Sequence, residues 1–394
     1  MILSVIAWIL ALAAGVPLAI FSLEVATGLP NARRAGAVGA AGCVVVLIPA
    51  HDEALGIAPT IDALKAVAGP DVRILVVADN CSDDTAAVAR AAGAEVIERS
   101  DATARGKGYA LAFGRDHIAG GASAPEVVIV MDADCRLAPG SIGALAASVM
   151  RGPGQPAQAI NLIAPDLAAP PMTQISSFAM VVKNLYRSRG MTRIGGSALL
   201  TGTGMAFPWG LFAAADLGSG SLVEDLGLGI TLVKAGHATM LVEDAGVSSA
   251  PAPPDAALAQ RTRWEHGFLD TARHTALPLL WSGLRRGAAK ELLLACHLLV
   301  PPLALLLMIA ALMLGMTTGL WAIGASIVPA ATLAAIFVVA LILVFVAWLH
   351  GGRRWLKGTA LLTAPLYILW KLPIYFGFVR RRETEWRRTE RADP

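Results

Sequence analysis

The sequence predicts an α/β catalytic domain with a Rossmann-like, mostly parallel sheet, and transmembrane helices at the N-terminal and C-terminal ends of the chain. Three observations support this fold class. The chain has a mean hydropathy of +0.62 and only 15% charged residues, which is too apolar for a soluble enzyme of 394 residues. Short apolar runs alternate with helical patterns over residues 40–280. Long uncharged stretches lie on both sides of that region.

The overall charge and the cysteines argue against several other classes of protein. A net charge of +3 gives no case for a nucleic-acid partner. The four cysteines are far apart and include no Cys-x-x-Cys pair. We therefore expect reduced thiols of a cytoplasmic domain, and neither a disulfide framework nor a cysteine zinc site.

The N-terminus predicts a membrane anchor. Residues 1–23 contain no charged side chain and are long enough to span a bilayer, which predicts a transmembrane anchor over residues 1–27. A cleaved signal peptide is the alternative, but such peptides usually begin with Lys or Arg, which this stretch lacks. Arg33 and Arg34 follow the apolar run, and positive charge favours the cytoplasmic side. The domain at 40–280 is therefore expected to be cytoplasmic.

Apolar segments also follow the catalytic domain. No Asp, Glu, Lys or Arg occurs over residues 292–352, which predicts two transmembrane helices over residues 288–350. Residues 359–379 are apolar too, but they contain two prolines and Lys371 and precede an arginine-rich end. We therefore expect 359–379 to be interfacial or re-entrant, and 380–394 to be a basic cytoplasmic tail. A full span with an exported tail is the alternative.

Within the catalytic domain, apolar runs predict buried strands and the stretches between them predict helices. The predicted strands are 43–50, 73–80, 94–99 and 127–134, and the predicted helices are 58–68, 83–93 and 107–119. Strands that alternate with helices indicate parallel pairing, and such sheets bind ligands at the carboxyl ends of their strands. Acidic residues fall at those ends, namely Glu53, Asp79, Asp132 and Asp134.

Asp132 and Asp134 follow an apolar strand and are separated by one residue. Because side chains of an extended chain repeat every two residues, both carboxylates should point to the same side. Carboxylate oxygens suit Mg²⁺ or Mn²⁺, ions that commonly bridge to substrate phosphates. The pair alone is weak evidence, since two acids in a solvated loop would look the same.

Three further motifs carry residues suited to phosphate or sugar chemistry. Lys107 lies between two glycines in GKGYAL, which suits a phosphate neighbour, although a solvated loop lysine is the alternative. The stretch VEDLGLG places Glu224 and Asp225 at the start of a predicted helix. The stretch QRTRW covers residues 260–264, and its Trp264 has an alternative interpretation as a belt residue at the membrane interface.

Taken in order, these motifs resemble those of an inverting family 2 glycosyltransferase with a GT-A fold, over residues 43–267. VEDLGLG and QRTRW narrow the resemblance to a membrane-embedded branch that includes cellulose, hyaluronan and chitooligosaccharide synthases and carries a Gln-x-x-Arg-Trp motif. The chain departs from the polymer synthases of that branch in having fewer apolar segments. This difference argues against a polysaccharide-conducting channel.

The resemblance implies a donor site. Glu53 and Asp79 match the acids that hold the base and ribose of the nucleotide. Asp132 and Asp134 match the Asp-x-Asp pair that binds the donor and a Mg²⁺ or Mn²⁺ ion, with Asp134 as the metal ligand. Lys107 is expected beside the phosphates.

The resemblance also implies residues for the transfer step and the acceptor. Asp225 matches the general base, and Glu224 stays open as its alternative because neighbours in sequence cannot be ranked without geometry. Gln260, Arg263 and Trp264 match the motif that meets the diphosphate and lines the acceptor site.

The function implied is transfer of a sugar from a nucleotide-diphosphate-sugar donor to a lipid-linked or glycan acceptor, in exopolysaccharide or glycolipid synthesis. The expected location is a bacterial-type inner membrane, in contact with membrane lipids and with the catalytic domain in the cytoplasm. A processive polysaccharide synthase is one alternative. A non-catalytic nucleotide-binding scaffold of an export assembly is another, but such a protein should have lost a motif residue, and none is missing.

Overall fold

The computed structural model describes residues 1–31, 42–152, 154–218, 223–251 and 254–380, and their contacts define two compact units. The sheet unit contains the described residues within 42–164 and 197–264, and the helical unit contains 1–31, 165–196 and 265–380. Residues 165–196 and 265–280 lie inside the predicted catalytic domain in sequence, but they group with the apolar helices. The predicted tail at 380–394 lies outside the described residues, apart from Arg380.

The described part of the sheet unit has one mixed, mostly parallel sheet with the strand order β3-β2-β1-β4-β7-β6-β8-β5. The strands are β1 (Val44–Ala50), β2 (Val72–Asp79), β3 (Glu95–Arg99), β4 (Val127–Val130), β5 (Cys135–Leu137), β6 (Ala157–Ile163), β7 (Met205–Pro208) and β8 (Met240–Ser249). Strands β3, β2, β1 and β4 are parallel neighbours, whereas β7 runs antiparallel between β4 and β6. The prediction of a mostly parallel sheet is confirmed.

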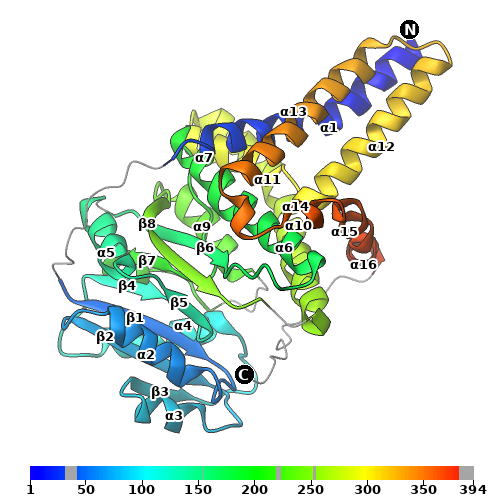
Figure 1. Cartoon of the computed structure of the whole chain (residues 1–394). Helices are drawn as coiled ribbons and strands as arrows, with labels where there is room; N and C mark the ends of the chain where they lie inside the picture. Colours follow the sequence, from blue (N-terminus) through cyan, green and yellow to red (C-terminus); the bar gives the residue numbers. More distant parts are fainter. Residues whose placement is uncertain (32–41, 153, 219–222, 252–253, 381–394) are drawn as a thin grey trace. The chain divides into compact units, whose positions relative to one another are not determined.

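Helices cover both faces of this sheet (Figure 1). They are α2 (Ile57–Val67), α3 (Thr85–Ala91), α4 (Lys107–Ala119), α5 (Ser141–Arg151), α8 (Trp209–Ala213) and α9 (Glu224–Lys234). On β1, Val46 and Ile48 pack in a core with α2 and α5, while Val45 and Leu47 pack in a second core with α4. Because successive strand residues point to opposite faces, a strand buried on both sides needs a continuous apolar run, as β1 has.

The parallel register brings the predicted donor residues to one edge of the sheet. Ala50 at the end of β1 pairs with Ala78 of β2, and Leu47 of β1 pairs with Val130 of β4. The chain moves from β1 outward to β2 and β3 in one direction, and β4 lies on the other side of β1. Open α/β sheets bind ligands at such a switch in strand order, beyond the carboxyl ends of the strands.

Helices are the only regular secondary structure among the described residues of the helical unit. They are α1 (Ile2–Gly28), α6 (Pro171–Val181), η1 (Val182–Arg187), α7 (Ser188–Arg193), the part of α10 (Pro254–Arg286) that starts at Glu265, α11 (Ala289–Leu298), α12 (Leu303–Ala322), α13 (Val328–His350), η2 (Gly352–Arg354), α14 (Gly358–Leu361), α15 (Ala364–Trp370) and α16 (Leu372–Arg380). Within the described residues, α1, α12 and α13 are long and apolar enough to cross a membrane, and they lie alongside one another (Figure 1). Apolar helices of spanning length at both ends of the chain are therefore confirmed.

Helix α1 is fastened to its neighbours by a buried ionic cluster. Glu24 is fully buried, and its Oε2 accepts a hydrogen bond from Arg187 Nε at 2.6 Å. Its Oε1 lies 2.8 Å from His297 Nδ1 of α11. A buried carboxylate is costly unless a cation and hydrogen-bond donors satisfy it, so these partners explain a charged residue in an otherwise apolar helix.

Two glycines allow α1 to approach η1 and α7 closely. A Cβ atom at Gly28 would overlap the carbonyl oxygen of Tyr186, and one at Gly190 would overlap the carbonyl oxygen of Glu24. Arg189 Nη1 also donates to the Gly28 carbonyl at 3.1 Å, at the end of α1. Small residues at such crossings permit backbone contact between membrane helices.

We expect Gly190→Ala to destabilise the helical unit by about 1–3 kcal/mol, the usual cost of overpacking. Gly319→Ala is the matched control, because Gly319 lies in α12 with open space around a Cβ atom. Alanine there should be neutral or stabilising by up to about 1 kcal/mol. Thermal unfolding of both variants in detergent measures the difference, and equal melting temperatures would rule out a tight crossing at Gly190.

Candidate active site

Asp79 and Glu53 lie at the carboxyl ends of β2 and β1, as predicted. Asp79 is 6% exposed, and its Oδ1 accepts a hydrogen bond from Arg99 Nη1 at 2.7 Å. Arg99 is the last residue of β3 and pairs with Asp79 in the strand register, and no sequence motif points to this cation. The Glu53 backbone N–H donates to Thr85 Oγ1 at 2.7 Å, so the loop after β1 is tied to the start of α3.

The loops after β1 and β2 are also held together by side chains. Asp52 accepts a 2.6 Å hydrogen bond from the Ser82 N–H, and Asp83 accepts one of 3.0 Å from the Ala54 N–H. The Asp52 and Asp83 carboxylates lie near the Cys81 thiol, and all three are groups that can bind a metal ion. Because both carboxylates already accept backbone N–H groups of these loops, we interpret this group as structural.

Lys107 is at the centre of the candidate site. It is the first residue of α4, and its ammonium group forms an ion pair with Asp132. The same ammonium donates to the carbonyl oxygen of Gly202 at 2.7 Å. Burial acts to lower the pKa of Lys107, but the nearby carboxylates of Asp132, Glu224 and Asp225 outweigh burial and raise it. The structure therefore brings three motifs that are far apart in sequence to one lysine.

Gly202 separates Lys107 from the acids of α9. Its φ is +82°, a region that favours glycine, and a Cβ atom there would lie 3.3 Å from Lys107 Nζ and 3.4 Å from Asp225 Oδ2. The next residue, Thr203, accepts a 3.1 Å hydrogen bond from the Asp132 N–H through Oγ1. Residues 201–204 therefore form a loop that contacts both the Asp-x-Asp motif and its lysine partner.

Gln158 of β6 holds this loop in place. It is 2% exposed, and its Nε2 donates to the Thr203 carbonyl at 2.9 Å. Its Oε1 accepts the Thr201 N–H at 3.0 Å. One buried amide thus fixes the residues on both sides of Gly202. No motif points to Gln158, although a polar residue in an apolar strand is a signal that could have found it.

Glu224 and Asp225 occupy the first turn of α9, where the helix dipole favours negative charge. The pKa of Glu224 is raised to about 7, first by burial and then by the Asp225 charge, while Lys107 opposes the shift. Asp225 Oδ1 accepts the Leu226 N–H at 2.8 Å. Glu224 therefore titrates near neutral pH.

Asp132 and Asp134 form the pair that can hold a divalent metal. Strand β4 ends at Val130, so both lie in the turn beyond it and not on the predicted strand. They still approach each other, because ligand atoms of Asp132, Asp134 and Cys135 all lie within 4.8 Å. Surrounding protein atoms, and next the Asp132 charge, raise the pKa of Asp134. A carboxylate whose ionisation is disfavoured by a neighbouring carboxylate fits a hard cation such as Mg²⁺ or Mn²⁺.

Gln260, Arg263 and Trp264 all lie on α10, at positions i, i+3 and i+4. Residues at this spacing share one face of a helix. Trp264 is 39% exposed. The structure thus places these three together, whereas no described contact links Gln260 or Trp264 with the cluster around Lys107.

An α/β sheet with an acidic strand edge, a paired lysine and a glycine loop is a site that suits a metal ion and a phosphate-bearing ligand. Residues 41–267 match the model of the glycosyltransferase like family 2. The chain belongs to this family and is a glycosyltransferase with a GT-A fold. No curated protein sequence matches it.

Solved structures resemble this chain at low sequence identity. A mannosyltransferase from Pyrobaculum calidifontis, in complex with GDP-Man and Mn²⁺, is 18% identical, with a TM-score of 0.56 over 94% of this chain and 99% of that chain. Glucosyl-3-phosphoglycerate synthase from Mycobacterium tuberculosis, in complex with Mn²⁺, UDP and phosphoglyceric acid, is 22% identical. It covers 56% of this chain and 79% of its own, with a TM-score of 0.37.

We expect Gln158→Leu to lower the turnover of the enzyme by about 10²-fold, the effect of misplacing a reacting group by roughly 1 Å. The substitution leaves the Thr201 N–H and the Thr203 carbonyl without their partner, so the loop at Gly202 should shift. Gln155→Leu is the control, because the Gln155 side chain makes no described hydrogen bond. Turnover and thermal unfolding are measured together. A folded Gln158→Leu enzyme with normal turnover would contradict the role of this amide.

The raised pKa of Glu224 predicts a pH dependence. Its carboxyl group is neutral below about pH 7 and charged above it, and the added negative charge strengthens nearby bases. The transfer rate should therefore rise with pH through an ionisation near 7, and Glu224→Gln should remove that ionisation. Initial rates over a pH series, for both proteins, test this. An unchanged inflection in Glu224→Gln would assign the ionisation to another group.

Proposed function

We propose that this enzyme is an inverting glycosyltransferase that moves a sugar from a nucleotide-diphosphate-sugar donor to a lipid-linked or glycan acceptor at a membrane. The observation that carries the proposal is the cluster in which Lys107 lies between Asp132 and the Glu224–Asp225 pair. In this arrangement, residues suited to binding the sugar donor and a candidate base surround the loop at Gly202. The GDP-Man and Mn²⁺ held by the structurally similar mannosyltransferase support a donor and metal of this kind.

The donor end of the site has separate positions for nucleoside and diphosphate. Glu53 and Asp79 lie at the ends of β1 and β2 and are proposed to hold the nucleoside. Asp132 and Asp134 are proposed to hold Mg²⁺ or Mn²⁺, which would neutralise part of the diphosphate charge. Lys107 is well placed to add a second positive charge, since its ammonium already contacts Asp132.

The transfer step needs a base on the acceptor side. The acceptor oxygen forms a bond to the anomeric carbon while the bond from that carbon to the diphosphate oxygen breaks, which inverts the carbon. The hydroxyl proton passes to a carboxylate, and we assign that role to Asp225. Asp225 Oδ2 lies beside Gly202, next to the lysine that contacts the donor motif. Glu224 is the alternative base, because its pKa of about 7 suits proton transfer.

The sequence motif on α10 supports assignment to the membrane-embedded branch that includes cellulose, hyaluronan and chitooligosaccharide synthases. Arg263 is proposed to meet the diphosphate, and its planar guanidinium suits forked hydrogen bonds to phosphate oxygens. Gln260 and Trp264 share its helix face and are proposed to line the acceptor site. Tryptophan offers an apolar surface on which a sugar ring can lie.

The membrane arrangement is also a proposal. We assign the bacterial-type inner membrane, with α1, α12 and α13 spanning it and the sheet unit in the cytoplasm. Residues 359–379 are proposed to lie at the interface, and the basic tail to be cytoplasmic. Three helices of spanning length in the described chain favour single additions to a lipid-bound acceptor, in glycolipid or exopolysaccharide synthesis, over processive synthesis.

Donor binding and turnover, measured separately, test these roles. Asp225→Asn should lower turnover by about 10²–10⁴-fold, the contribution of a positioned base, with little change in donor affinity. Asp132→Asn should weaken donor binding strongly. Asp116→Asn, an exposed acid on α4, is the control and should change neither quantity. Calorimetry gives the donor affinity and nucleoside diphosphate release gives the turnover.

Two outcomes would change the assignment. If Asp225→Asn loses donor binding as badly as Asp132→Asn, then Asp225 belongs to the donor or metal site. If Glu224→Gln alone abolishes turnover while Asp225→Asn does not, Glu224 is the base.

A further inference from the structure

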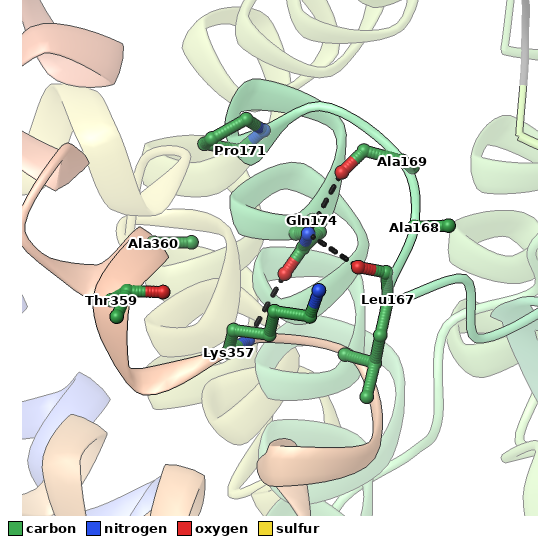
Figure 2. Close-up of a pocket in the computed structure, with 8 residues that line it drawn as sticks. All are labelled: Leu167, Ala168, Ala169, Pro171, Gln174, Lys357, Thr359 and Ala360. Atoms are coloured by element: carbon green, nitrogen blue, oxygen red, sulfur yellow. Dashed lines mark hydrogen bonds between the residues drawn. The ribbon is translucent and has the colours of Figure 1, made fainter.

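A cavity of about 330 Å³ lies in the helical unit, and no residue that lines it is assigned to the transfer reaction (Figure 2). One wall is formed by the segment that enters α6, with Leu167, Pro171 and Gln174. The other wall is formed by the segment that enters α14, with Lys357, Thr359 and Ala360. The lining therefore combines apolar side chains with the Gln174 amide, one cation and one hydroxyl.

The two walls are joined by the side chain of Gln174, which is 4% exposed. Its Nε2 donates to the carbonyls of Leu167 at 3.1 Å and Ala169 at 2.8 Å. Its Oε1 accepts the Lys357 N–H at 3.0 Å (Figure 2). Every polar atom of this amide is used inside the protein, so the cavity is preformed and Gln174 is not a ligand for its occupant.

Lys357 supplies the charge of the cavity. Its backbone is fixed by Gln174, while its exposed side chain extends along the cavity toward the Leu167 wall in Figure 2. In the described part of the chain, no carboxylate lies within ion-pair distance of its ammonium group. The Thr359 hydroxyl also lines the cavity, and ammonium and hydroxyl groups are donors that suit phosphate oxygens.

The sequence position of the cavity residues indicates that the cavity lies at the level of a membrane surface. Lys357 follows the end of α13, one of the helices of spanning length. Trp348 near that end donates from Nε1 to the Leu356 carbonyl at 2.8 Å, and the Arg353 guanidinium lies 5.0 Å from the centre of its ring. Tryptophan and basic side chains gather where a bilayer meets water.

An exposed apolar row continues from the cavity. Leu362, just after α14, and Leu366 and Leu369 of α15 are 83%, 59% and 57% exposed, whereas Tyr367 and Lys371 are buried. Lys371 forms an ion pair inside the unit with Glu265. A helix that faces water exposes its charged side chains and buries its leucines. This segment does the reverse, so its exposed leucines fit lipid chains.

We propose that this cavity binds the phosphate group of a membrane lipid. The Lys357 ammonium and the Thr359 hydroxyl donate to phosphate oxygens, and the lipid chain lies along Leu362, Leu366 and Leu369. A bilayer phospholipid and the phosphate of a lipid-linked acceptor share this chemistry. Only binding of a lipid-linked acceptor rests on the proposed function. Because lipid binding is measured without any sugar donor, the cavity proposal and the proposed function can fail independently.

The test is lipid binding to the purified full-length protein by native mass spectrometry. The probes are phosphatidylglycerol, a polyprenyl phosphate, diacylglycerol and inorganic phosphate. We expect Lys357→Gln to weaken binding of a lipid phosphate by about tenfold or more, the loss of one charge-assisted hydrogen bond. Arg354→Gln is the matched control, because it removes an exposed cation that does not line the cavity, and it should change binding by less than about twofold.

The four probes separate the possible ligands. Tighter binding of phosphatidylglycerol than of the polyprenyl phosphate assigns a bilayer lipid, and the reverse order assigns the lipid-linked acceptor. Either result supports the site if Lys357→Gln weakens it selectively. Equal losses in Lys357→Gln and Arg354→Gln, or equal binding of diacylglycerol, would overturn the phosphate site. Inorganic phosphate binding as tightly as the lipids would overturn the role of the leucine row.

Discussion

The candidate site depends on one electrostatic constraint, which is the convergence of four carboxylates at one edge of the sheet with the Lys107 ammonium among them. One ammonium cannot balance four negative charges in a partly buried place. The remaining charge is removed either by protonation or by another cation. Glu224, with its pKa of about 7, uses the first route, and the adjacent Asp132 and Asp134 are suited to the second. A divalent cation at Asp132 and Asp134 would thus complete the charge balance of the site.

Neutral hydrogen-bonding groups fix the positions of the charged residues in this cluster. The carbonyl of Gly202 accepts from Lys107, and the hydroxyl of Thr203 accepts from the Asp132 backbone. Thr201 and Thr203, on either side of Gly202, are held by the buried amide of Gln158. A network of this kind is stable when every member is satisfied, and it fixes side chains before substrate binds. The rigid sheet therefore supplies the geometry, and the motif residues supply the chemistry.

Buried charges are also paired in the helical unit, but here apolar side chains face outward. Glu24 is paired with Arg187, and Glu265 is paired with Lys371, while leucines and other apolar side chains face outward. In a protein surrounded by lipid, charged groups are directed inward to one another and apolar groups outward. This inversion explains why the central lysine of the segment 359–379 is compatible with a membrane location, since its charge is neutralised inside the unit.

The sequence by itself determined the class of fold, the glycosyltransferase family and the helices of spanning length. These properties depend on local patterns, such as the apolar run of β1, buried on both faces, and the uncharged run over 292–352. Only the tertiary structure decided the pairing of Asp79 with Arg99, the contact of Lys107 with Gly202 and the use of Gln158. Such partners are set by strand register and by the paths of loops between distant segments. Those follow from packing of the whole sheet, and no local pattern records them.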